Sequence, residues 1–70
     1  MIVEKWHNLL DIINYNFNCY EWNIMAKNGI SYKVIAYHDV EKPYVSAKDE
    51  YGRTVKIYEE DILRIAGDKK

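Results

Sequence analysis

Apolar residues near the start of the chain recur at the spacing of one helix face. Over residues 2–14 the intervals between them are four, three and four, with polar residues in between, as in an amphipathic helix. The apolar positions are Ile2, Trp6, Leu9 and Ile13. An isolated helix of this length is marginal in water. We therefore expect an N-terminal helix that packs its apolar side on the rest of the chain.

The next segment, residues 18–28, is open to two interpretations. Asn18 followed three residues later by Glu21 is a capping-box pattern, which indicates a second helix. Apolar and polar residues also alternate from Tyr20 to Lys27, which indicates a strand with one buried face.

The pairing of residues 18–28 with the segment that follows favours the strand. If residues 27–29 form a three-residue hairpin loop, Gly29 takes the left-handed position that such loops require. Every apolar residue of the first strand then meets another on the same face. The opposed pairs are Ala26 with Ile30, Ile24 with Tyr32, Trp22 with Val34, and Tyr20 with Ala36.

A second hairpin follows from the same reasoning. Residues 44–49 and 53–58 flank a loop at 50–52 that again ends in glycine, Gly52. This register places opposite charges, Asp49 and Arg53, at the two sides of the turn. The opposed pairs on one face are Val45 with Ile57 and Ala47 with Val55, and on the other Tyr44 with Tyr58 and Ser46 with Lys56.

The C-terminal part is predicted to hold a polar turn at residues 59–61, a brief last strand and a polar tail at residues 66–70. Residues 1–70 then form a single domain, with the helix at 2–14 and antiparallel strands within 19–65. The predicted fold class is α+β and mainly β, with the helix packed on a small antiparallel barrel of about five short strands.

One helix followed by consecutively paired short strands resembles the SH3-like small barrels, and among them the Sm-like proteins of the bacterial Hfq family. The resemblance is carried by the turn at Asn28-Gly29 and by the stretch from Ile57 and Tyr58 to Ile62. It implies a ring of subunits that binds single-stranded RNA. The family has a basic pair after the tyrosine, whereas Glu59 and Glu60 stand there in this sequence and are expected to repel phosphate.

Composition excludes several classes of function. Seventy residues with a formal charge of −1 are too few for a two-domain enzyme and provide no overall positive field for nucleic acid. No apolar run is long enough for a membrane span or a signal peptide, so a cytoplasmic location is expected. Cys19 is the only cysteine, which rules out an internal disulfide. Many Lys, Asn, Ile and Tyr residues point to an AT-rich genome, such as that of a bacteriophage.

Two groups of residues are candidate sites. Tyr44 and Tyr58 are predicted to lie on an outward face with Lys48 and Lys56, and rings interleaved with ammonium groups suit nucleic acid or a nucleotide. The second group, Trp6, Tyr15 and Phe17, is a candidate interface, because aromatic residues concentrate at binding hot spots. No metal site, cofactor or catalytic residue is expected: His7, Asp11, His38 and Asp39 lack any metal-binding spacing.

We therefore expect a non-enzymatic binding module that acts stoichiometrically by docking a protein, such as a phage accessory protein that inhibits a host or defence factor. Binding of RNA or another single-stranded nucleic acid, or sequestration of a nucleotide, is the alternative. A homo-oligomer is expected, because a chain of 70 residues builds only a small core and open strand edges favour pairing between copies.

Overall fold

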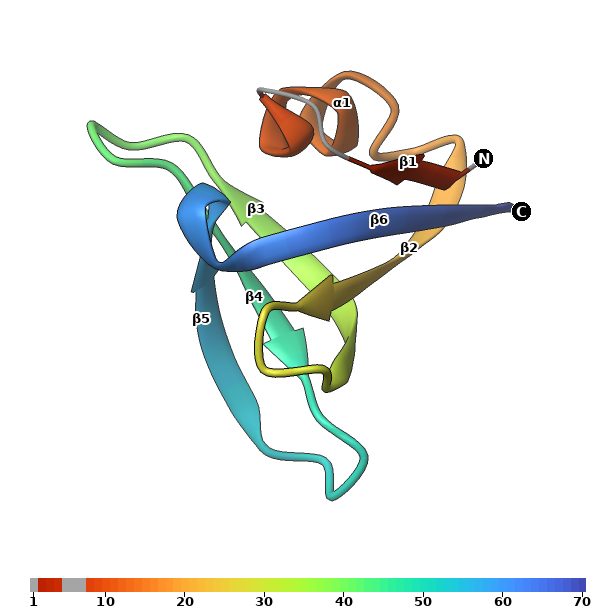
Figure 1. The fold of residues 1–70 in the computed structure, drawn as a ribbon. Helices are drawn as coiled ribbons and strands as arrows, with labels where there is room; N and C mark the ends of the chain where they lie inside the picture. The colour runs from red at the N-terminus through yellow and green to blue at the C-terminus, as the bar shows by residue number, and fades with distance from the viewer. Residues whose placement is uncertain (1, 5–7) are drawn as a thin grey trace.

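The computed structural model describes residues 2–4 and 8–70 and folds them into one antiparallel sheet with a short helix (Figure 1). The strands are β1 (Ile2–Glu4), β2 (Tyr20–Ala26), β3 (Ser31–His38), β4 (Tyr44–Lys48), β5 (Thr54–Tyr58) and β6 (Ile62–Lys69). The helix α1 (Leu9–Tyr15) precedes β2, and a 3-10 turn, η1 (Glu59–Asp61), joins β5 to β6. The order across the sheet is β1-β6-β2-β3-β4-β5.

The strand interpretation of residues 18–28 is confirmed, and the second-helix alternative is wrong. Ile24 lies opposite Tyr32, and Gly29 has a φ of 85° at the third loop position. The amide of Ala26 donates a hydrogen bond to the carbonyl of Ile30 at 3.0 Å. The three-residue loop therefore sets the register of this hairpin, as its sequence predicts.

The hairpin register does not extend along the whole of β2. Its pairing with β3 covers Asn23 to Met25, so the pairs predicted for Trp22 and Tyr20 with β3 are wrong. These residues instead lie opposite Gly67 and Lys69 of β6. The physical reason is a bulge between Val34 and Ala36, where the pairing of β3 with β4 shifts, since a bulge bends a strand and increases its twist.

The second hairpin matches its prediction at every pair. Val45 lies opposite Ile57, Ala47 opposite Val55, Tyr44 opposite Tyr58, and Ser46 opposite Lys56. Gly52 has a φ of 79°, and the Nε atom of Arg53 lies 3.0 Å from Oδ2 of Asp49. Pro43 stands directly before β4, at a position where its missing N–H leaves the ladder intact.

The predicted N-terminal helix over residues 2–14 is wrong at residues 2–4, and its residues 5–7 lie outside the described part of the chain. Residues 2–4 form β1, which pairs with β6 through Val3 and Ile65. Asn8 has a φ of 70° in the left-handed region, which interrupts helical geometry, so α1 begins at Leu9. Asparagine adopts this conformation more readily than most residues.

The C-terminal tail and the closed barrel are also corrected. Residues 66–70 were expected to be a polar tail, but β6 runs to Lys69, because its far end pairs with the first half of β2. The sheet thus has six strands instead of about five, and its edges are β1 and β5. The described residues contain no pairing between these edges, so the barrel is not closed.

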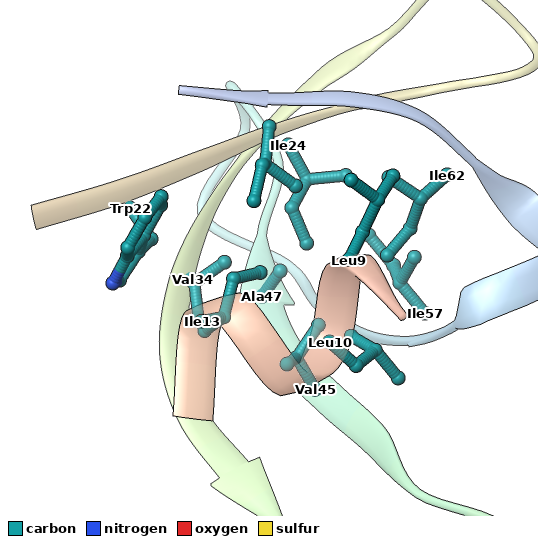
Figure 2. Packing of buried hydrophobic residues seen from close by; sticks show 11 residues of the cluster. Leu9, Leu10, Ile13, Trp22, Ile24, Val34, Val45, Ala47, Ile57 and Ile62 are labelled. Carbon is teal, nitrogen blue, oxygen red and sulfur yellow. The ribbon is translucent and has the colours of Figure 1, made fainter. Parts of the chain in front are cut away.

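The core lies between α1 and the inner face of the sheet. Figure 2 shows the helix side chains of Leu9, Leu10 and Ile13 directed toward residues of the strands. The buried strand residues of this cluster are Trp22, Ile24, Val34, Val45, Ala47, Ile57, Ile62 and Ile65. Full burial of each large aliphatic side chain contributes about 1.5–3 kcal/mol. This packing fixes which face of β3, β4 and β5 is turned outward.

Candidate functional site

The outward-facing positions of β3, β4 and β5 form a continuous surface, which we call the outer face. Val45 and Ala47 are fully buried, so the alternating residues of β4 point away from the core. Directly opposed residues on neighbouring strands share a face, which extends the surface to both sides of β4. The outer face comprises Lys33, Ala36 and His38 of β3, Tyr44, Ser46 and Lys48 of β4, and Thr54, Lys56 and Tyr58 of β5.

Three rings form a row across one end of the outer face. The ring of His38 stacks on that of Tyr44, with centroids 4.5 Å apart and an interplanar angle of 18°. The rings of Tyr44 and Tyr58 are tilted relative to each other, with their centroids 5.6 Å apart. A hydrogen bond of 2.8 Å between Nε2 of His38 and Oγ of Ser46 fixes the imidazole orientation. The row is therefore held by neighbouring side chains before any ligand arrives.

Lysine side chains border this row. The Nζ atom of Lys56 lies 4.9 Å from the ring centroid of Tyr44, and that of Lys42 lies 4.6 Å from the ring of Tyr58. At the other end, Lys33 and Lys48 are directly opposed on β3 and β4 and exposed. Like charges in this position destabilise a sheet. None of the nine outer-face residues is acidic, so this surface is positive although the chain has a formal charge of −1.

The two glutamates expected to repel phosphate have other contacts. Oε1 of Glu59 accepts a hydrogen bond from the amide of Leu10 at 3.1 Å. This contact stabilises the start of α1, where Asn8 makes no side-chain cap. Glu60 accepts a hydrogen bond of 2.9 Å from Nζ of Lys42, which raises the pKa of Lys42. Neither carboxylate belongs to the outer face.

Tyr37 of β3 lies opposite the buried Val45 and is influenced by several carboxylates. Burial raises the pKa of the Tyr37 hydroxyl, and the carboxylates of Asp11, Asp39 and Glu59 raise it further. The outer face is positive and the region beside the start of α1 is negative, so charge is unevenly distributed over this small chain.

The structure brings together the four predicted residues Tyr44, Lys48, Lys56 and Tyr58 on the outer face. The candidate interface is not assembled in the same way. Tyr15 is 90% exposed, Phe17 packs partly buried against the core, and Trp6 lies outside the described residues.

Sequence reasoning missed His38 and Lys33 as members of the outer face. His38 is the last residue of β3 and lies opposite Tyr44. The loop between β3 and β4 is too long to predict how the two strands pair. The bulge between Val34 and Ala36 also shifts their register.

Residues 2–4 and 8–70 meet neither the requirements of a metal site nor those of a membrane-spanning helix. Within residues 2–4 and 8–70 there is no group of three or more His, Cys, Asp or Glu side chains arranged to hold a metal ion. His7 lies outside the described residues. In that same part of the chain no helix has both the length and the apolar composition to cross a membrane. Cys19 is an exposed free thiol.

The chain matches no protein-family model, and comparison with curated proteins and with solved structures gives no match either.

Proposed function

We propose that the protein is a non-enzymatic module that binds single-stranded nucleic acid across the outer face of β3, β4 and β5. The observation that carries the proposal is the row of His38, Tyr44 and Tyr58 beside the ammonium groups of Lys42 and Lys56. Stacking of a base on an aromatic side chain contributes about 1–3 kcal/mol, and lysines neutralise the phosphates.

The arrangement favours an unpaired strand over a duplex. Bases of a duplex stack on one another and do not offer their faces to protein rings, whereas unpaired bases do. Lys42 and Lys56 lie over the tyrosine rings, in places that an incoming base would take. Their flexible stems let the displaced ammonium groups move to the adjacent phosphates.

The strand order supports a related proposal about the fold. β2 to β5 are consecutively paired, and β6 returns to the far side of β2 after the η1 turn. We interpret this as an SH3-like layout that is open between its edges, with β1 added beside β6. The Sm-like relationship suggested by the sequence stays part of this proposal.

Binding can be tested by fluorescence anisotropy with a labelled single-stranded 12-mer. Tyr58→Ala and Lys56→Glu are each expected to weaken binding by about tenfold or more, which corresponds to the loss of one stacking or phosphate contact. Lys69→Glu is the matched control, because Lys69 is exposed at the end of β6 and this change alters the net charge equally. The proposal is wrong if the control weakens binding as much as Lys56→Glu does.

Salt dependence gives a second readout of the same site. If about three lysines contact phosphates, the logarithm of the affinity should fall against the logarithm of the salt concentration with a slope of roughly −2. Lys48→Ala should make this slope shallower by about 0.7. A slope near zero would instead indicate contacts that do not involve phosphate.

Docking of a protein is the second candidate function, and one observation favours it. Near the two hairpin loops, Ile30 and Tyr51 are 45% and 75% exposed and line a hollow of about 390 Å³ together with Tyr32 and Val55. Exposed aromatic and aliphatic side chains are typical of interface hot spots. A host or defence factor is the expected partner, and such binding should change little with salt and should be weakened by Tyr51→Ala.

A further inference from the structure

A hollow of about 380 Å³ adjoins the row of rings where β5 ends. Tyr58 belongs both to the row and to the lining of this hollow. Leu10 of α1 and Pro43 before β4 add apolar surface, and Lys42 lies at the same place over the Tyr58 ring. The hollow therefore begins at the Tyr58 end of the row.

We propose that the hollow takes one base of the bound strand and favours a base that carries an exocyclic amino group, as cytosine does. This inference rests on the proposed binding of single-stranded nucleic acid. The apolar surface of Leu10 and Pro43 and the ring of Tyr58 suit the face of a base. The acidic residues that line the same space are Asp11, Glu59 and Glu60.

The charge of the lining decides what can enter. Carboxylates accept hydrogen bonds from the amino group of cytosine, whereas they repel phosphate and the carbonyl oxygen that uracil carries at the equivalent position. Within residues 2–4 and 8–70 no salt bridge involves Asp11. Glu60 is paired with Lys42, but both side chains are more than 60% exposed, and exposed pairs of this kind are weak and easily opened.

The test compares oligodeoxycytidine with oligodeoxyuridine of equal length. Their bases share the same ring size and differ in the amino or carbonyl group at C4 and in the proton on N3, which only uracil carries. Anisotropy titrations are expected to show at least fivefold tighter binding of the cytidine strand, within the discrimination that one such contact provides. Asp11→Asn should reduce this preference to less than twofold, mainly through tighter binding of the uridine strand. Glu60→Gln should act in the same direction.

Glu41→Gln is the matched control. Glu41 lies exposed in the same loop as Pro43 and does not line the hollow, so its replacement removes one negative charge without changing the contact. Glu41→Gln should raise the affinity for both strands equally and leave the ratio of the cytidine-strand affinity to the uridine-strand affinity unchanged. A ratio that falls as far in Glu41→Gln as in Asp11→Asn would show a general charge effect and overturn the inference.

Two further outcomes separate the inference from the proposed function. Equal, measurable affinity of the wild-type protein for both strands overturns the base preference and leaves binding on the outer face standing. Failure to bind either strand at low salt overturns both proposals.

Discussion

At the scale of single residues, the packing of Trp22 in the core depends on Gly67. Because Gly67 has no side chain, the indole of Trp22 can lie directly against it. These residues lie opposite each other on β6 and β2, and the Trp22 indole, 2% exposed, covers the glycine. A Cβ atom at position 67 would lie 2.8 Å from Cζ3 of Trp22. The indole Nε1 also donates a hydrogen bond to the carbonyl of Asn16 at 3.4 Å, which limits its freedom to move aside.

Gly67→Ala is therefore expected to lower the free energy of unfolding by about 1–3 kcal/mol, as overpacked cores do. Urea denaturation followed by tryptophan fluorescence measures the change. Asp68→Ala on the same strand is the control, since its side chain is exposed and the effect should stay within about 0.5 kcal/mol. Equal midpoints for Gly67→Ala and the wild type would contradict the close packing of Trp22.

At the scale of elements, the β4–β5 turn depends on one carboxylate. Oδ1 of Asp49 accepts hydrogen bonds from the amides of Tyr51 and Arg53, both at 2.9 Å, and Oδ2 accepts one from Nε of Arg53. Partial burial of Asp49 opposes its ionisation, but these hydrogen bonds and the guanidinium charge outweigh that effect and lower its pKa. The turn is thus stabilised by the ionised form.

A pKa that is lower in the folded than in the unfolded state stabilises the fold above the unfolded value of about 3.9. This contribution is lost as the pH falls through the folded pKa. Asp49→Asn should accordingly destabilise the protein at pH 7 and have a smaller effect near pH 2. Thermal unfolding at both pH values checks this, with Glu50→Gln in the same loop as the control. An effect of Asp49→Asn that is the same at both pH values would contradict the assignment.

Elements whose partners are close in sequence were predictable, and those with distant partners were not. The two hairpins follow from loops that end in Gly29 and Gly52, and with them the pairing of Tyr44 with Tyr58. β1 depends on the pairing of Val3 with Ile65, and the second half of β6 on pairings such as Lys69 with Tyr20, which no local pattern encodes. Ile2 fits a helical stripe as well as a strand. His38 lies in the candidate site because of the bulged register between β3 and β4. No local sequence pattern predicts this register, so His38 was missed.

At the scale of the whole molecule, two sheet edges bear on assembly. β1 and β5 end the sheet, and an edge strand offers unpaired N–H and C=O groups to another chain. Tyr15 adds an exposed aromatic side chain near the helix end. We propose that copies associate, and light scattering at increasing micromolar concentration should show a mass above 8.4 kDa. A mass that stays at the monomer value would contradict this.

NMR titration of the labelled protein with an unpaired oligonucleotide tests most directly whether single-stranded nucleic acid binds on the outer face. We expect the largest amide shift changes on the outward positions of β3, β4 and β5, with His38, Tyr44 and Tyr58 among them. The amides of the β2–β3 and β4–β5 loops should move least. Changes confined to those loops, or no changes at oligonucleotide concentrations well above the protein concentration, would contradict this expectation.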